Sequence, residues 1–436
     1  MRRKILLVSQ VYAPDPAAVA RLVADVGTEL AQRGHEVIVL TADRGYDNPT
    51  IKYASATTTE GVHVRRLPFC SFGKGRMALR VLGGVSFTLQ AAVRGLTIPG
   101  LDTVVVSTSP PMAALAAVVI NALRRVRVVY WPMDLNPDQA VTLGLADPRS
   151  FMVRALEWLN RAVLRRAETV VALDQAMARR LSAKRPVDSK IVVVPPWGEE
   201  DDVTPVPADE NPFRREHGLE GKRVVMYSGT LGPSNPVTTL LDAAEQFEND
   251  PRLVFLFVGG GTGMAEVKSR KRANVRCLPY EPLSRMRYSL SAGDVQVVSL
   301  GDEMAGIVHP CKVYGAMGIA RPILFLGPPD SHVSEMMAQA DFGWQVRHGD
   351  VAGAVAALRE ILALDEKALE LRGSRARDLI QNDRTRRISC GRVCDAIEAR
   401  TRPAAAPKER AVASMHRART DGVAPPSVGS GHAADR

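Results

Sequence analysis

The sequence predicts an α/β protein with two domains, each built around a doubly wound parallel sheet. The chain has 436 residues, which is more than one hydrophobic core usually accommodates. Its expected strands are short, unbroken runs of valine, isoleucine and leucine. Such runs are typical of parallel strands that helices cover on both faces. The alternation of strands and helices pauses near residue 195 and starts again near residue 223, so we expect two similar halves.

The first domain is expected over residues 1–200. It begins with a strand at Lys4–Val8, and a helix over about residues 19–33 follows. The basic start of the chain resembles a secretion signal, but Ser9 and Gln10 interrupt the apolar run, which favours a buried strand. Further strands are expected at residues 36–41, 62–67, 103–107, 126–131, 168–173 and 190–194, with a helix at residues 112–124.

The second domain is expected over residues 215–385, after a linker that is rich in proline and acidic residues. Residues 386–401 are expected to form a helix that packs back on the first domain. Residues 402–436 are expected to be a disordered basic tail, because they lack hydrophobic periodicity. The strands expected in this domain are at residues 223–228, 253–258, 294–299 and 322–325.

Composition limits the class of protein. A net charge of +10 favours polyanionic partners such as nucleotide phosphates or anionic lipid headgroups, although a basic protein without such a partner is an alternative. Only 5% of residues are aromatic and no zinc-finger or RNA-recognition pattern occurs, so nucleic acid is not an expected partner. Five scattered cysteines argue against a disulfide framework and for a cytoplasmic location. No apolar run reaches the roughly 18 residues of a membrane span.

Loops that follow strands are the candidate sites, because open α/β sheets bind ligands outside the carboxyl ends of their strands. The first such loop covers residues 10–21 and leads into a helix, whose N-terminus would favour an anion. Arg21 either adds a positive charge to this site or lies on a solvated face of the helix. The sequence leaves both alternatives open.

The second loop holds an aspartate without a structural explanation. Asn136 as N-cap, Pro137 at the first helical position and Gln139 at the capping-box position have ordinary roles at a helix start. Asp138 would gain from the helix dipole. Asp134 stands at the carboxyl end of a strand, where its carboxylate could orient or deprotonate a hydroxyl group.

The later loops combine glycines with one lysine. Gly229 and Gly232 follow a strand and let backbone amides approach a phosphate. The glycines of residues 257–263 match a dinucleotide-binding pattern only weakly, since they follow a later strand, and a tight turn is preferred. Lys312 is the only charged residue of the segment Gly306–Met317 when histidine is counted as neutral.

The order of these segments, over roughly residues 4–400, resembles the family 4 glycosyltransferases, in particular those that build bacterial surface polysaccharides. The resemblance rests on Ala17-Ala18 in the first loop, on Met133-Asp134-Leu135 in the second, and on Pro310-Cys311-Lys312-Val313-Tyr314 in the second domain. It implies the GT-B fold, in which two Rossmann-like domains face each other across a cleft.

The resemblance also implies a reaction. The expected activity is a retaining, metal-independent transfer from a nucleotide-diphosphate sugar, with no cofactor. Asp134 would position the acceptor hydroxyl, and Lys312 would stabilise the departing diphosphate, so both are the expected catalytic residues. The expected donor-binding residues are Gly229, Thr230, Gly232, Leu278, Tyr314 and Gly315. The residues expected at the acceptor or phosphate loop are Ala17, Ala18, Arg21 and Asp138.

The chain departs from the family pattern at several positions. The family usually has two glutamates where this chain has Ile307 and Gly315. Many members have arginine and lysine where Thr230 and Asn235 stand, and a histidine just before the aspartate of the second loop. Lys312 is therefore the expected phosphate cation, and the glutamate that would hold the donor ribose has no matched substitute.

Residues 61–101 contain no acidic residue and carry arginines among apolar residues. Such a basic amphipathic segment suits an anionic membrane surface, and relatives that build surface polysaccharides act on polyprenyl-linked acceptors. We therefore expect a lipid-linked or saccharide acceptor and a peripheral place on the inner face of the plasma membrane. An ordinary helix with solvated arginines is the alternative.

Two other functions fit the same fold. A nucleotide-sugar 2-epimerase would need acid and base residues in the cleft, and few of the eight histidines follow strands. A noncatalytic scaffold at the membrane is favoured by the missing glutamates. Glu303 and His309 lie near the missing pair but out of register with it.

Overall fold

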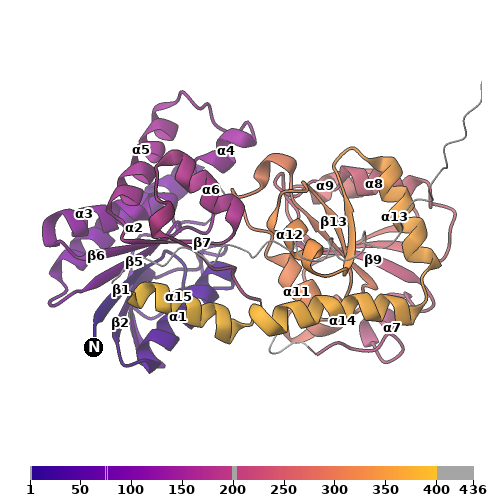
Figure 1. Cartoon of the computed structure of the whole chain (residues 1–436), viewed down its shortest axis with the longest axis horizontal. Coiled ribbons are helices and arrows are strands. Elements are labelled where there is room, and N and C mark those ends of the chain that lie inside the picture. Colours follow the sequence, from indigo (N-terminus) through magenta and orange to yellow (C-terminus); the bar gives the residue numbers. More distant parts are fainter. Residues whose placement is uncertain (1, 74, 76, 199–203, 400–436) are drawn as a thin grey trace, which may run out of the picture.

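The computed structural model describes residues 2–73, 75, 77–198 and 204–399, which form two α/β domains side by side (Figure 1). The tail expected at residues 402–436 lies outside this part of the chain. Each domain contains one sheet with helices on both faces. The predicted fold class, two doubly wound parallel sheets in the GT-B arrangement, is confirmed.

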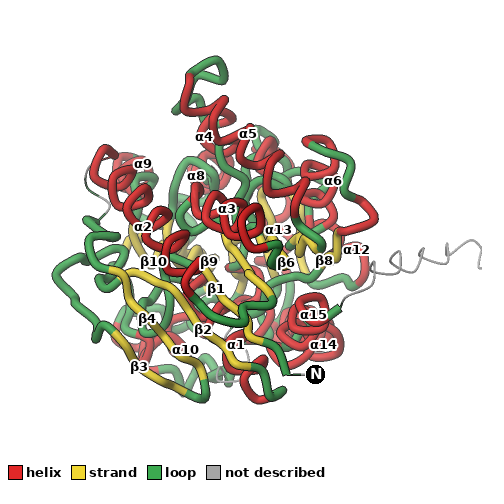
Figure 2. The backbone as a smooth tube through the Cα atoms, turned by 90° about the vertical axis from the view of Figure 1, so that its left-hand side faces the viewer, coloured by secondary structure: helices red, strands yellow, loops and turns green. Residues whose placement is uncertain are grey.

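The N-terminal sheet has the strand order β3-β4-β2-β1-β5-β6-β7-β8, and β3 is its antiparallel edge strand. Its strands are β1 (Lys4–Val8), β2 (Glu36–Ala42), β3 (Ala56–Thr59), β4 (Val62–Leu67), β5 (Thr103–Ser107), β6 (Arg127–Trp131), β7 (Thr169–Ala172) and β8 (Ile191–Val193). Its helices are α1 (Ala18–Gln32), α2 (Met77–Thr97), α3 (Ala114–Arg124), α4 (Asp138–Thr142), α5 (Phe151–Arg166) and α6 (Gln175–Lys184). Figure 2 shows α2, α3 and α5 on one face of the sheet and α1 on the other.

The C-terminal sheet has the order β11-β10-β9-β12-β13-β14 and is parallel throughout. Its strands are β9 (Arg223–Thr230), β10 (Leu253–Gly260), β11 (Val275–Leu278), β12 (Val295–Ser299), β13 (Ile323–Leu326) and β14 (Gly343–Val346). Its helices are α7 (Pro212–Glu216), α8 (Thr238–Glu245), α9 (Met264–Ser269), α10 (Met286–Ser291), α11 (Lys312–Gly318), α12 (His332–Gln339), α13 (Val351–Ala363) and α14 (Glu366–Asp383). Helices α8 and α13 cover one face, and α11 and α14 cover the other.

Several details differ from the sequence-based expectations. Strands β3, β11 and β14 were not expected, because Ala56–Thr59, Val275–Leu278 and Gly343–Val346 are not the unbroken apolar runs typical of buried strands. Asn136 is not the N-cap of α4: Pro137 occupies that position, and no side chain caps the helix. The Asn136 carbonyl instead accepts a hydrogen bond from Asn160.

The chain returns to the N-terminal domain at its end. Helix α14 runs along the C-terminal domain, and α15 (Arg386–Glu398) packs against α1 and β7 (Figure 1). Arg127, at the start of β6, donates to the carbonyls of Ile397 and Ala399 and, at 3.3 Å, to that of Ala396. Burial lowers the pKa of this guanidinium. Arg127 therefore fixes the last turn of α15 on the N-terminal sheet.

Replacing Arg127 with methionine should leave these carbonyls without donors. We expect the free energy of unfolding to fall by about 3 kcal/mol in urea titration, because breaking a buried charged network leaves desolvated groups unpaired. Arg33 also contacts α15, through Asp395 and Glu398, but the Asp395 side chain is 70% exposed. Arg33→Met should therefore cost less than about 1 kcal/mol. Equal costs for the two variants would contradict the role given to Arg127.

Candidate active site

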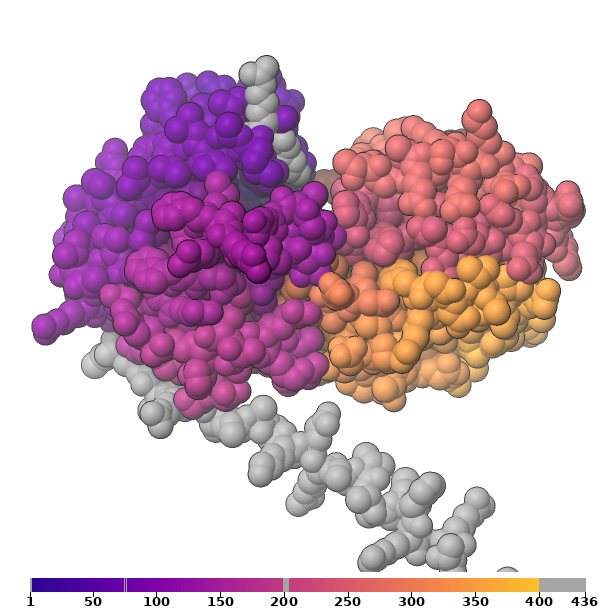
Figure 3. All heavy atoms as spheres, turned by 90° about the horizontal axis from the view of Figure 1, so that it is seen from above, coloured from indigo at the N-terminus to yellow at the C-terminus, as the bar shows by residue number. Residues whose placement is uncertain are grey.

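The carboxyl ends of the two sheets face each other where the domains meet, and Figure 3 shows the two lobes in contact there. The loop after β6 contacts the C-terminal domain directly. The amide of Leu135 donates to the carbonyl of Ile307 at 2.8 Å. The Gln139 side chain donates to the Ser234 hydroxyl at 3.3 Å. The candidate loops of both domains therefore surround one interdomain site.

Lys312 is the first residue of α11 and lies against the carboxyl end of β9. Its Nζ donates to the carbonyl of Thr230 at 2.6 Å and to the hydroxyl of Tyr227, and it lies 4.1 Å from the centroid of the Tyr227 ring. Among the described residues no carboxylate forms an ion pair with Lys312. Burial lowers the pKa of this ammonium to about 7. A desolvated cation without a counter-ion is a strong binding group for an anion.

The glycines beside Lys312 are required by close packing. Gly229 has φ +114°, and a Cβ there would lie 2.8 Å from Cε of Lys312. Gly259 has φ +139°, and a Cβ there would lie 2.2 Å from the carbonyl oxygen of Gly229. The glycines after β10 thus let two loops touch, which agrees with the tight turn expected from the sequence. A Cβ at Gly232 would have no neighbour within 4 Å, so this glycine borders open space.

Thr230 links Lys312 to an exposed aromatic ring. Its hydroxyl shares a 2.7 Å hydrogen bond with the hydroxyl of Tyr280, whose side chain is 56% exposed. A Cβ at Gly260 would lie 2.8 Å from this ring. Leu278, at the end of β11, is half-buried just before it. Tyr280 and Tyr227 were not among the expected site residues, because nothing in the sequence pattern separates a site aromatic from a packing one.

Asp134 lies at the carboxyl end of β6, as expected. Its amide and that of Met133 donate to the Thr108 hydroxyl at 3.3 and 3.0 Å. Burial raises the pKa of its carboxyl to about 6, and His309 opposes this shift. No described residue donates a hydrogen bond to the carboxylate. It can therefore accept one from a ligand.

Tyr314 and Gly315 follow Lys312 on α11. Tyr314 has no exposed surface, and its hydroxyl lies 2.8 Å from His309 Nε2 and 3.0 Å from His332 Nε2. Its hydroxyl is therefore bonded within the protein, and its expected donor contact stays a prediction. Gly315 is half-buried. Asn235 also points away, because its side-chain amide donates to the carbonyl of Ser299 at 2.7 Å.

The loop after β1 presents its helix start to the same region. Ala17 is the N-cap residue of α1 and Ala18 its first residue, and no side chain caps the helix. The amide of Ala17 donates to Asp15 at 3.0 Å, so a carboxylate already occupies part of this loop. Arg21 is half-buried on α1.

Asp138 is held in a structural ion pair. Its carboxylate lies 2.8 Å from Lys184 Nζ, on α6, and Lys184 also contacts Glu157 on α5. The structure gives Asp138 this pairing, and its expected acceptor or phosphate contact stays a prediction. The pairing ties α4 to α5 and α6.

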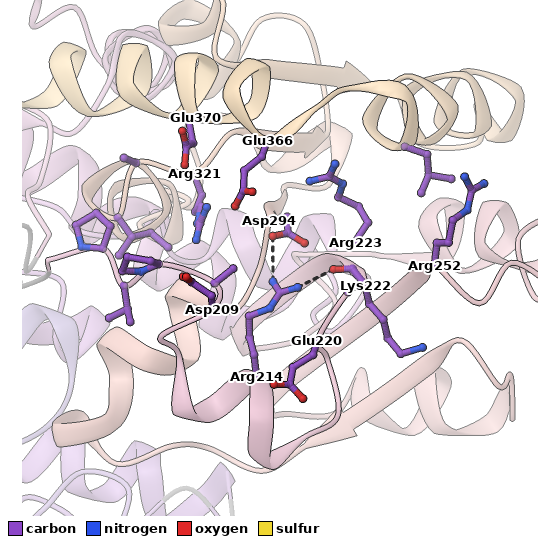
Figure 4. Close-up of a pocket in the computed structure, with 18 residues that line it drawn as sticks. Asp209, Arg214, Glu220, Lys222, Arg223, Arg252, Asp294, Arg321, Glu366 and Glu370 are labelled. Carbon is purple, nitrogen blue, oxygen red and sulfur yellow. Dashed lines mark hydrogen bonds and ion pairs between the residues drawn. The ribbon is translucent and has the colours of Figure 1, made fainter.

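A cavity of about 960 Å³ lies at the other end of the C-terminal sheet (Figure 4). Arg214 lies in its wall and donates to Asp294 at 3.0 Å and to the carbonyl of Lys222 at 2.6 Å. These residues precede β9 and β12, so the cavity borders the amino ends of strands whose carboxyl ends face Lys312. It is separate from the interdomain site. Among the described residues there is no group of three or more histidine, cysteine or acidic side chains placed to hold a metal.

Comparison with known proteins agrees with this geometry. Residues 17–197 match the model of the glycosyl transferase 4-like domain. Probable glycosyltransferase WbjE of Pseudomonas aeruginosa is 25% identical over 292 residues, which cover 66% of this chain and 72% of that protein. Putative colanic acid biosynthesis glycosyl transferase WcaI of Escherichia coli K12 is 24% identical over 336 residues, which cover 72% of this chain and 81% of that protein.

Solved structures show the same fold. Sucrose-phosphate synthase from Thermosynechococcus elongatus superposes with a TM-score of 0.72 at 15% identity, covering 91% of this chain and 98% of that one. HepE from Anabaena, solved with UDP and glucose, superposes with a TM-score of 0.67 at 14% sequence identity. The match covers 91% of this chain and 100% of HepE. WaaG, a glycosyltransferase involved in lipopolysaccharide biosynthesis, superposes with a TM-score of 0.64 at 14% sequence identity. The match covers 90% of this chain and 99% of WaaG. Residues 17–197 therefore match a glycosyl transferase 4-like domain, and the chain as a whole has the GT-B fold of known glycosyltransferases.

Proposed function

We propose that this enzyme transfers a sugar, with retention, from a nucleotide-diphosphate sugar to a lipid-linked or saccharide hydroxyl in surface-polysaccharide synthesis. The names of WcaI and WaaG, which refer to colanic acid and lipopolysaccharide biosynthesis, support the pathway. The complex of HepE with UDP-glucose supports the class of donor. The observation that carries the proposal is the unpaired, desolvated ammonium of Lys312 between the two domains.

Lys312 acts on the leaving group. As the bond between the sugar and the diphosphate breaks, negative charge develops on the phosphate oxygens, and a fixed cation stabilises that charge more than it stabilises the intact donor. The Thr230 carbonyl and Tyr227 hydroxyl hold Nζ in place without neutralising it. The charge of Lys312 supports a transfer that needs no metal and no cofactor. Gly232 borders open space, so its backbone can approach the diphosphate closely.

Asp134 acts on the acceptor. Its carboxylate accepts a hydrogen bond from the incoming hydroxyl and orients it toward the sugar, and the raised pKa makes it a better proton acceptor than a solvated aspartate. The exposed Tyr280 ring, linked through Thr230 to Lys312, offers a flat apolar surface to the nucleobase. Retention is what the resemblance to family 4 implies.

The N-terminal domain presents an apolar, basic surface. Leu82, Val85, Leu89 and Val93 of α2 are 56%, 40%, 59% and 62% exposed, and their spacing of three or four residues places them in one stripe. Trp158 on α5 is 63% exposed. The exposed arginines of these helices are Arg80, Arg94, Arg154, Arg161 and Arg165.

This combination supports peripheral binding to an anionic membrane, which would bring a lipid-linked acceptor to the enzyme on the cytoplasmic side. Arg66 does not contribute to this basic surface, because it is buried and donates to the carbonyls of Ala13 and Ala54. Lys74 and Arg76 lie outside the described residues. Within the described part of the chain, no helix is long and apolar enough to span a membrane.

The two rival functions have less support. An epimerase needs acid and base groups that reach the sugar, but His309 and His332 are buried and bonded to Tyr314. A noncatalytic scaffold has no use for a desolvated lysine that lowers stability. Titration with UDP-, GDP- and ADP-sugars by calorimetry, followed by an assay for transfer, separates the three: binding with transfer supports the proposal, and no binding to any donor overturns it.

Replacing Lys312 with methionine should remove the phosphate cation and stabilise the empty protein. The affinity for the best-bound nucleoside diphosphate should fall roughly 10- to 100-fold by calorimetry, the usual value of a charge-assisted hydrogen bond. Folding lowers the pKa of Lys312 from 10.5 to about 7. The unfolded chain therefore binds more protons between these pH values, and the buried ammonium costs stability at neutral pH.

Without ligand at pH 7, Lys312→Met should consequently melt a few degrees higher than the parent. The stability of the parent should rise with pH above about 7, while that of Lys312→Met should rise less. Lys222→Met is the matched control, because Lys222 lies beside the distal cavity and donates to the carbonyl of Pro251. Unchanged nucleotide affinity in Lys312→Met would remove Lys312 from the site.

The rate of transfer should depend on the ionisation of Asp134. Because its pKa is raised to about 6, the reactive carboxylate forms as the pH rises through that value, so kcat/KM should rise with it and should fall again above about pH 7, where Lys312 of the free enzyme loses its proton. Asp134→Asn should lower kcat by roughly 10²- to 10⁴-fold and remove this rise, with nucleotide affinity retained. A variant that keeps the parent pH profile would show that another group titrates.

Introducing charge on α2 should weaken membrane binding without affecting the donor site. Leu89→Glu combined with Val93→Glu should reduce sedimentation with phosphatidylglycerol vesicles and leave nucleotide affinity unchanged, because glutamate opposes both apolar burial and anionic lipid. Leu371→Glu is the control, since Leu371 is 54% exposed on α14 of the other domain. Equal vesicle binding by the parent and the double variant would contradict this orientation.

A further inference from the structure

The segment that lacks the family glutamate makes an extensive contact with the N-terminal domain. Ile307, which stands at the position of that glutamate, has no exposed surface and packs in the hydrophobic core of the N-terminal domain, together with Met133, Leu135 and Met177. Ala176 of the N-terminal domain packs in turn in a core of the C-terminal domain. The two domains therefore exchange apolar side chains at this point.

Gly306 permits this contact. It has φ +71°, and a Cβ there would lie 2.4 Å from the carbonyl carbon of Ala176 and 2.6 Å from the amide nitrogen of Met177. Both atoms belong to backbone and cannot move aside as a flexible side chain would. Glycine at position 306 is thus what allows the segment to lie against the start of α6.

Polar bonds hold the segment on both sides of Ile307. Arg180 on α6 donates to the carbonyl of Ala305 at 2.6 Å and to that of Glu303 at 2.9 Å. The amide of Leu135 donates to the carbonyl of Ile307 at 2.8 Å. Three backbone carbonyls of the C-terminal domain are therefore satisfied by donors from the N-terminal domain.

His309 and Asp174 complete the contact with a buried bond. His309 Nδ1 lies 2.8 Å from Asp174 Oδ2, and the two side chains are 1% and 3% exposed. Asp174 Oδ1 also caps α6 by accepting from the amide of Met177 at 2.7 Å. The bond lowers the pKa of Asp174 against its burial. On its other side, His309 reaches the hydroxyl of Tyr314, two residues beyond Lys312 on α11.

We propose that residues 303–309 form an interdomain clamp, and that Ile307, His309 and Asp174 are positioning residues for Lys312. The clamp fixes how the two sheets face each other and, through His309 and Tyr314, where α11 places Lys312. The importance of placing Lys312 rests on the proposed function, whereas the contact between the two domains does not. Where relatives use a glutamate to hold the donor, this chain uses the same position to hold its other domain.

Restoring the family residue tests the proposal. A glutamate at position 307 would enter an apolar core without a cation to pair with, so Ile307→Glu should separate the domains. We expect a larger radius of gyration in small-angle X-ray scattering without ligand. If the closed form falls to about a tenth of the population, nucleotide affinity should fall about tenfold. A closed Ile307→Glu variant that binds nucleotide more tightly than the parent would overturn the proposal.

The bond between His309 and Asp174 can be separated from the cap of α6. Asp174→Ser keeps a good N-cap side chain but is too short to reach His309. His309→Phe keeps the ring but removes the bond, and His309→Asn offers a new donor to Asp174. We expect the first two variants to open in scattering and to raise KM for the donor, and His309→Asn to recover part of the closure. Asp174→Ser and His309→Phe proteins that stay as compact as the parent would overturn the role of this bond.

A pair of glycine variants controls for backbone strain. Gly306→Ala and Gly100→Ala impose similar strain, since φ is +71° and +67°, but a Cβ at Gly100 would have no neighbour within 4 Å. Only Gly306→Ala should open the molecule, and opening by both or by neither would contradict the clamp. Scattering without ligand also separates the two proposals. If the parent binds no nucleotide but these substitutions still open the molecule, the proposed function fails and the clamp stands.

Discussion

The burial of Ile307 in the core of the N-terminal domain is the contact on which the arrangement of the two domains depends. A GT-B protein places its reacting groups on separate domains, so their relative position is not fixed by either core. Here one side chain crosses from the second domain into the first, beside hydrogen bonds donated by Arg180 and Leu135 and the one that Asp174 accepts from His309. The groups that we propose for binding the donor and the acceptor are thereby brought into one site.

The chemistry of the site depends on charges that the protein leaves unpaired. Lys312 is surrounded by neutral oxygens and an aromatic face, and the buried carboxylate of Asp134 accepts no hydrogen bond from the described residues. Each carries a desolvation cost in the empty protein, and each pKa is moved toward neutrality as a result. Groups that pair with a ligand and not with each other keep their interaction energy for the bound state.

Much of the fold could be predicted because buried parallel strands have a distinctive composition. Lys4–Val8 and Thr103–Ser107 are found with the predicted bounds, whereas the polar edge strand Ala56–Thr59 escaped detection. The site was only partly predictable. Asp134 and Lys312 could be located because each follows a recognisable strand or motif. The partnership of His309 with Asp174 spans 135 residues and two domains, and no local pattern encodes such a pair.

The return of α15 to the N-terminal domain has a consequence for how the protein is made. The first domain is translated early, yet the carbonyls that accept from Arg127 lie at Ala396, Ile397 and Ala399. During synthesis, one face of the N-terminal sheet therefore stays only partly covered until the second domain has been translated. A product released before that point lacks α15, so completion of the N-terminal core requires that the second domain has been translated.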